Sequence, residues 1–213
     1  MSYMTAFGSL RTLGLCASLF FSASVLGGCA AAADEPGTES DESVAAAEDD
    51  LSNADAPLAN LVKVRPGLYR GGHPSTAGLK QLQQLGVNTI IDLEVGDFIE
   101  ATPRAIKREL EDAPKYGMKV IHKPMSAFEP ALSGRFDKQM DSIIKELGNA
   151  ANGTMYVHCR HGRDRTGLVI GLERFYLENW SAPKAYQEML DRGFRTFFLG
   201  LREYYERKTG WEN

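Results

Sequence analysis

Short apolar runs alternate with amphipathic stretches along the chain from about residue 60 onward. Runs rich in β-branched residues are typical of strands, whereas apolar residues spaced three or four apart indicate helices. We expect strands at 61–64, 68–70, 87–93, 118–122 and 154–158, and helices at 75–85, 103–116, 133–147, 166–178, 183–192 and 199–208. This alternation predicts an α/β fold with a single, mostly parallel central sheet and helices on both faces. Ligands of such sheets bind outside the carboxyl ends of the strands.

The first 56 residues lack this periodicity. Residues 13–26 are nearly all apolar or small, follow a single charge at Arg11 and run into Gly27-Gly28-Cys29, which is typical of a secretory signal peptide. Leu26-Gly27-Gly28-Cys29 resembles the bacterial lipobox, which implies cleavage before Cys29 and lipidation of its thiol. A plain signal peptide and a retained anchor are the alternatives, although the run is short for a span of about 20 residues. We therefore expect a lipoprotein signal peptide at 1–28.

Residues 29–56 read as a low-complexity acidic tether of Ala, Asp, Glu and Ser, which we expect to be disordered. The tether carries nine Asp and Glu residues and no Lys or Arg. The expected folded domain, 57–213, therefore holds 23 of the 24 Lys and Arg residues, since only Arg11 lies outside it, and 19 of the 28 Asp and Glu residues. Its net charge is about +4, against −4 for the whole chain, and it favours anionic ligands.

The lipobox resemblance implies an exported protein that its lipid holds in the bacterial cell envelope, in the periplasm or at the outer membrane. Ala30, rather than Asp, follows Cys29, which resembles outer-membrane sorting. The chain has three cysteines, of which Cys16 leaves with the signal peptide and Cys29 carries the lipid. Cys159 then has no disulfide partner and is a candidate reactive thiol.

Cys159 lies in the stretch VHCRHGRDRTG, residues 157–167, between a predicted strand and a predicted helix. Backbone N–H groups in a turn before a helix form an anion site, and Arg165 can donate to two phosphate oxygens at once. Nearby positive charge favours the thiolate, so that Cys159 can attack a bound phosphate at neutral pH. We expect the following residues to bind phosphate: Arg160, His161, Gly162, Arg163, Asp164 and Arg165.

HCRHGRDRTG resembles the His-Cys-x5-Arg-Thr signature of the cysteine-dependent protein-tyrosine and dual-specificity phosphatase superfamily. The resemblance implies that Cys159 is the nucleophile, that Arg165 binds phosphate, that Thr166 assists the departing thiolate and that His158 supports the loop. Residues 67–93 look like the small atypical dual-specificity group, which includes inositol-phosphate phosphatases. The family implies a dual-specificity-phosphatase-like fold and a phosphocysteine intermediate, with neither a metal nor a cofactor.

Members of this superfamily usually take the catalytic proton from an aspartate in the loop before the cysteine unit. The corresponding loop here, 124–134, contains no aspartate. Glu129 is the nearest equivalent, and Asp164 inside the cysteine loop is its rival. The alternatives are a solvated surface acid for Glu129 and a structural acceptor for Asp164, so the identity of the general acid stays open here.

Five further residues follow strands or flank late turns. Arg70 and His73 can line the pocket or simply satisfy a turn, and Asp92 is expected to cap the turn after its strand. Arg192 and Arg195 can bind outlying phosphates, although solvated charges are the ordinary interpretation.

These features predict a phosphatase that acts on inositol polyphosphates, phosphotyrosine or both. Three side chains counted as positive, Arg160, His161 and Arg163, favour a densely charged ligand. Such a substrate is either a phosphorylated small molecule or a phosphoprotein. The alternative is a non-catalytic phosphate-binding lipoprotein. We expect a monomer that contacts the membrane through its lipid, and no nucleic-acid motif is found in the sequence.

Overall fold

The computed structural model describes residues 58–96, 103–128 and 134–212. The expected signal peptide, the tether and the proposed lipidation site at Cys29 lie outside these ranges, as does the acid candidate Glu129. The expected helix cap at Ser133 is also outside the described residues.

Five strands of the described chain form one sheet with the order β1-β2-β5-β3-β4. β1 pairs antiparallel with β2, and the other three pairs are parallel, so the expectation of a mostly parallel sheet is confirmed. The strands are β1 (Val62–Arg65), β2 (Leu68–Gly71), β3 (Thr89–Asp92), β4 (Lys119–His122) and β5 (Met155–His158). β5 lies between β2 and β3 and is buried at every position, which places its carboxyl end at the middle of the sheet edge.

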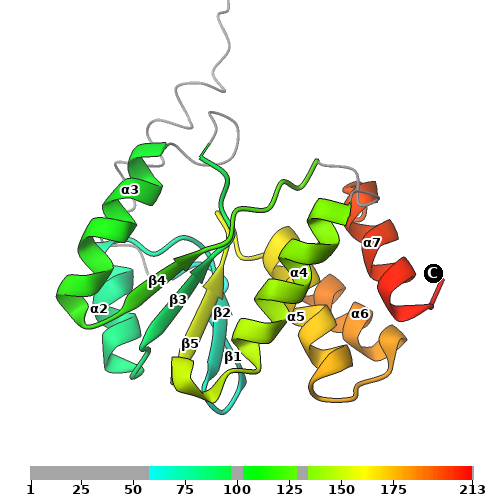
Figure 1. Cartoon of the computed structure of the whole chain (residues 1–213), viewed down its shortest axis with the longest axis horizontal. Helices are drawn as coiled ribbons and strands as arrows, with labels where there is room; N and C mark the ends of the chain where they lie inside the picture. The colour runs from blue at the N-terminus through cyan, green and yellow to red at the C-terminus, as the bar shows by residue number, and fades with distance from the viewer. Residues whose placement is uncertain (1–57, 97–102, 129–133, 213) are drawn as a thin grey trace, which may run out of the picture. The chain divides into compact units, whose positions relative to one another are not determined.

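Helices cover both faces of the sheet, as the alternating pattern predicts (Figure 1). One face carries α2 (Thr76–Gln84), α3 (Pro103–Asp112) and the short 3₁₀ helix η1 (Ala113–Tyr116). The other carries α4 (Gly134–Leu147), α5 (Asp164–Tyr176), α6 (Ala182–Asp191) and α7 (Leu199–Thr209). A second 3₁₀ helix, η2 (Ala150–Asn152), precedes β5. Two separate hydrophobic clusters fill the two interfaces.

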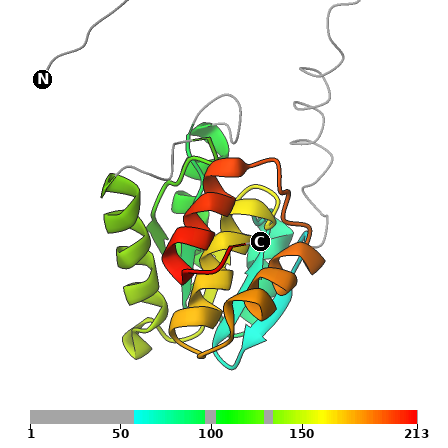
Figure 2. The same cartoon turned by 90° about the vertical axis from the view of Figure 1, so that its right-hand side faces the viewer.

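α5 is the central helix of the larger layer. It is buried from Asp164 to Arg174, because α4, α6 and α7 pack around it (Figure 2). The sequence predicts a start at 166, but the helix begins at Asp164. An acidic residue in the first turn interacts favourably with the positive end of the helix dipole, which explains the earlier start.

α2 begins and ends as the sequence indicates. The hydroxyl of Ser75 accepts a hydrogen bond from the N–H of Gly78, and Gly86 adopts the left-handed conformation that ends the helix. This helix fixes where the β2–α2 loop, which carries His73, meets the sheet edge. No helix within the described parts of the chain has both the length and the apolar character that a membrane span requires.

Candidate active site

The loop from Cys159 to Arg163 connects the end of β5 to the start of α5. Cys159 is buried, with 3% of its surface exposed, and it forms no disulfide. Gly162 has a φ of +67°, and a Cβ at this position would overlap the backbone of Gly71. Only glycine fits there, so the loop backbone is pressed against the end of β2.

Side chains from two other segments hold this loop in place. Arg70 on β2 donates from Nη2 to the carbonyl of Gly162 at 2.9 Å. The amide of Asn60 donates to the same carbonyl at 3.3 Å, and the N–H of His73 donates to the carbonyl of Arg160 at 3.1 Å. Three residues upstream of α2 thus hold the loop carbonyls of Arg160 and Gly162.

Arg70 is buried to 1% exposure and does not line an open pocket. Burial lowers its pKa to about 10, although nearby Glu188 and Cys159 oppose this shift, so Arg70 stays charged at neutral pH. Its Nε and Nη1 atoms have no hydrogen-bond partner among the described residues. The sequence suggested that Arg70 either lines a pocket or satisfies a turn. Neither interpretation includes its observed role as a buried cation that holds the loop. Its position on a strand with buried neighbours was the available signal.

Arg165 and Thr166 occupy the first turn of α5, as their places in the motif require. Arg165 donates from Nη1 to the carbonyls of Leu93 at 3.1 Å and Met125 at 3.2 Å, which lie beyond β3 and β4. The hydroxyl of Thr166 is fully buried and has no hydrogen-bond partner within the described parts of the chain.

The outer residues of the loop differ in charge from the sequence expectation. Burial lowers the pKa of His161, and the guanidinium groups of Arg160, Arg195 and Arg163 lower it further. His161 is therefore neutral at pH 7, and counting it as a third positive side chain of the loop was wrong. Burial is the largest cause, and each positive neighbour adds to it by disfavouring another charge.

Asp164 is held by Arg195, 31 residues further along the chain. Its Oδ2 lies 2.6 Å from Nη2 and 3.1 Å from Nε, and its Oδ1 accepts from the backbone N–H of Arg195 at 2.9 Å. Both carboxylate oxygens are engaged, so the geometry favours a structural acceptor over a proton donor. Arg195 is a bracing residue and not simply a solvated charge.

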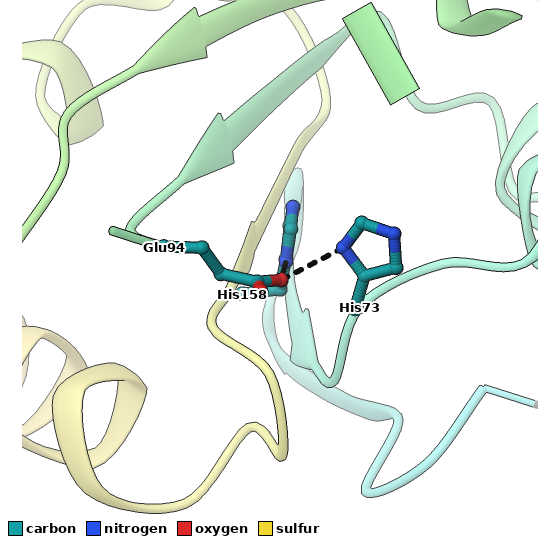
Figure 3. Close-up of side chains that lie close together, drawn as sticks. All are labelled: His73, Glu94 and His158. Carbon is teal, nitrogen blue, oxygen red and sulfur yellow. Dashed lines mark hydrogen bonds and ion pairs between the residues drawn. The ribbon is translucent and has the colours of Figure 1, made fainter. Parts of the chain in front are cut away.

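A buried cluster of ionisable groups lies behind the loop, at the carboxyl ends of the strands (Figure 3). His73 comes from the β2–α2 loop, Glu94 follows β3 and His158 ends β5. His73 Nδ1 lies 2.7 Å from Glu94 Oε1, and His158 Nδ1 lies 3.4 Å from the same oxygen. On its other side, His158 Nε2 lies 3.1 Å from Oε1 of Glu109 on α3.

This arrangement sets the charges of the cluster. Burial alone would lower the pKa of His158, but Glu109, Glu94 and Asp92 raise it well above its usual value. Burial also opposes the charge of Glu94, but His158 and His73 hold its pKa far below the ordinary range. Glu94 also raises the pKa of His73 against the effect of burial. His158 is therefore an imidazolium between two carboxyl groups, directly before Cys159.

Asp92 is the last residue of β3, and its carboxylate caps the turn that follows the strand. It accepts from the N–H of Glu94 at 2.8 Å, which confirms the expected cap of the turn after β3. Burial raises its pKa to about 6, and the carboxylates of Glu109 and Glu94 add to the rise while His158 opposes it. The neighbouring His122 donates from Nε2 to the carbonyl of Glu94 at 2.8 Å.

The cluster has the donor types of a metal site. Atoms of His73, Glu94 and His158 lie within 4.8 Å of one another, as do those of Asp92, Glu109 and His158. The raised pKa of both His73 and His158 means that protons already occupy the imidazole nitrogens near neutral pH. A metal would have to displace these protons, because only a neutral imidazole binds metal.

Comparisons with known proteins agree with this geometry. A family model described as "Tyrosine phosphatase family" matches residues 56–198. The dual specificity protein phosphatase TpbA of Pseudomonas aeruginosa is 31% identical over 139 residues, which are 65% of this chain and 56% of TpbA. The inositol diphosphatase DSP2 of Oryza sativa subsp. japonica is 23% identical over 132 residues, 62% of this chain and 61% of DSP2. The chain thus spans less than two thirds of the length of either relative.

The fold is also that of solved structures. The core catalytic domain of the PP-IP phosphatase SIW14 from S. cerevisiae, in complex with citrate, aligns with a TM-score of 0.56. The alignment covers 70% of this chain and 85% of that domain at 24% identity. This similarity confirms the expected dual-specificity-phosphatase-like fold.

The charge of His158 is predicted to depend on Glu94. In Glu94→Gln, both imidazoles lose an anionic partner, so the pKa values of His158 and His73 should each fall by about one unit or more. Titration of the imidazole nitrogens by NMR measures this. Glu111→Gln removes an exposed carboxylate of α3 and serves as the control. An unchanged titration of His158 in Glu94→Gln would contradict the arrangement described.

Proposed function

This chain belongs to the tyrosine phosphatase family, and we propose that it hydrolyses phosphate monoesters through a phosphocysteine intermediate. The observation that carries the proposal is the position of Cys159. Cys159 lies between the end of β5 and the first turn of α5, which carries Arg165, and Arg70 donates to the loop carbonyl of Gly162. A thiolate in such surroundings is a nucleophile for a bound phosphate.

In the first step, the thiolate of Cys159 attacks phosphorus on the side opposite the ester oxygen. The S–P bond forms as the P–O bond breaks, and the leaving oxygen takes a proton from a general acid. Arg165 and the N–H groups at the start of α5 bind the phosphate oxygens and stabilise their charge in the transition state.

In the second step, water attacks the phosphocysteine. The S–P bond breaks and its electron pair returns to sulfur, while the proton of the water passes to the acid, now a carboxylate. The buried hydroxyl of Thr166 donates to the departing thiolate, and inorganic phosphate is released. No metal or cofactor is needed for the electron balance of either step.

Two substrate classes fit this chemistry. One relative is named a dual specificity protein phosphatase and another an inositol diphosphatase, which supports phosphotyrosine and inositol polyphosphates alike. The guanidinium groups of Arg160 and Arg163 on the outer side of the loop favour the more densely charged class. We therefore propose inositol polyphosphates as the preferred substrates, with phosphotyrosine hydrolysed as well.

The test uses Cys159→Ser. This variant should lose all turnover of inositol hexakisphosphate and of a phosphotyrosine peptide while still binding both, because Arg165 and the loop N–H groups remain. Released phosphate and calorimetric binding are measured on the same samples. The unmodified chain should show the larger kcat/KM on inositol hexakisphosphate.

Two outcomes would count against this proposal. A chain that binds phosphate esters but never turns them over would be a non-catalytic binding protein, the alternative function. A tenfold or greater preference for the peptide would overturn the inositol assignment and leave the phosphatase activity in place.

The proposed general acid is Glu129, because Arg195 engages both oxygens of Asp164. Glu129→Gln should lower kcat by at least tenfold on an ester with a poor leaving group and much less on one with a good leaving group. Asp164→Asn should lower both by similar factors and lower Tm, because it breaks a structural ion pair. A loss at Asp164 that grows with the pKa of the leaving group would reverse the two roles.

We also propose that the chain is a lipoprotein of the bacterial cell envelope, on the strength of Leu26-Gly27-Gly28-Cys29 and the apolar run before it. Lipid at Cys29 would hold the catalytic domain at a membrane surface through the acidic residues 30–56. The substrate would then be a phosphate ester outside the cytoplasm.

Labelling with radioactive palmitate in a bacterial host tests this. The unmodified chain and the control Cys16→Ser should both incorporate label, whereas Cys29→Ser should incorporate none and accumulate as a longer precursor. Label in Cys29→Ser, or none in the unmodified chain, would rule out a lipid at this position.

A further inference from the structure

A cavity lies beside the loop, and Cys159 is not among the residues that line it. Its volume is about 310 Å³. It is bounded by the segment before β1, the outer side of the loop and the turn after α6. The lining residues are Ala59, Asn60, His161, Arg163, Arg192 and Gly193.

Two arginines give this cavity uncompensated positive charge. Among the residues that the structure describes, neither Arg163 nor Arg192 takes part in an ion pair. Of the acids next to them in the sequence, Asp164 pairs with Arg195 and Asp191 accepts a hydrogen bond from Gln187, and neither forms an ion pair with Arg163 or Arg192. Burial lowers the pKa of His161, which also lines the cavity, and the guanidinium of Arg163 is one of three that lower it further. Such a concave cationic site favours an anion over water.

The walls of the cavity are fixed to the loop that carries Cys159. Asn60 has a φ of +56°, and its side-chain amide donates both to the carbonyl of Arg192 at 3.1 Å and to that of Gly162 at 3.3 Å. Gly193 has a φ of +85°, and the stem of Arg163 passes 3.4 Å from where its Cβ would lie. The cavity therefore keeps a set position relative to the nucleophile.

We propose that this cavity is a subsite for a second phosphate group, one that is bound but not hydrolysed. The inference rests on the proposed phosphatase function. Arg163 and Arg192 bind the second phosphate while Arg165 and the loop N–H groups hold the first. A substrate with one phosphate leaves the subsite empty, and one with several phosphates on a small ring fills both.

The experiment removes the charge of Arg192 and measures how the enzyme's preference between two substrates changes. The readout is the ratio of kcat/KM on inositol hexakisphosphate to kcat/KM on a phosphotyrosine peptide, both measured with the full chain. Arg192→Gln should lower this ratio at least tenfold, Arg192→Glu should lower it further, and Arg192→Lys should retain most of it. The control Lys145→Gln removes one positive charge from the last turn of α4, and it should leave the ratio unchanged.

These variants are suited to the test because Arg192 contributes to the fold through its backbone. Its backbone N–H donates to the carbonyls of Glu188 and Met189 at the end of α6, and its carbonyl accepts from the side-chain amide of Asn60. Neither contact depends on the Arg192 side chain. Thermal unfolding checks that Tm is retained. A ratio for Arg192→Gln within twofold of the Lys145→Gln value would overturn the subsite while leaving the phosphatase proposal intact.

Binding to Cys159→Ser separates the subsite from catalysis and distinguishes two sources of phosphate. Adding Arg192→Gln to this variant should weaken inositol hexakisphosphate binding by tenfold or more even if no substrate is ever turned over. Inorganic phosphate is titrated in parallel. If Arg192→Gln abolishes a second inorganic phosphate site but leaves inositol hexakisphosphate binding unchanged, the cavity is a site for the free ion and the substrate subsite is refuted.

Discussion

The buried charge of His158 is the constraint around which the catalytic edge is organised. An imidazolium with no exposed surface is stable only if anionic partners compensate for its lost hydration. Glu94 and Glu109 supply this compensation, and His73 in turn engages Glu94. Removing one partner of such a buried pair typically costs about 3–5 kcal/mol. The β2–α2 loop, the end of β3 and α3 are therefore required to meet at one point, directly behind the nucleophile.

The loop that follows His158 is anchored to this cluster at its start, and further contacts, mostly from arginines, hold the rest of it in place. Arg70 and Asn60 hold the carbonyl of Gly162, and Arg165 is bound to carbonyls beyond β3 and β4. Arg195 ties Asp164 to the α6–α7 turn. Because these contacts use loop carbonyls and a loop carboxylate, the groups left for a ligand are N–H donors and cations. In the proposed reaction, this arrangement would supply preorganised donors for phosphoryl transfer.

Local sequence patterns were sufficient to predict most of the fold and the centre of the candidate site. Strand and helix periodicity, Ser75 and Gly86 at the ends of α2, and the motif around Cys159 all act over a few residues, so the sequence could show them. The roles that the sequence did not reveal depend on contacts between residues far apart along the chain. Asp164 meets Arg195 across 31 residues, and Arg70 resembled a turn residue until β2 was seen to pair with the buried β5. The lowered pKa of His161 depends first on its burial and then on arginines from two segments, neither of which is visible in a single motif.

The charges of the domain fall into two groups with different consequences. Behind the loop, cationic histidines are matched by carboxylates, and the group is close to electrically balanced. In front of the loop, Arg163 and Arg192 face a cavity without a carboxylate partner in the described structure. The balanced group stabilises the folded edge, whereas the unbalanced group costs stability through mutual repulsion and recovers it only when an anion binds. Such a pattern suits a ligand with more negative charge than a single phosphate, because Arg165 and the start of α5 are proposed to bind one phosphate by themselves.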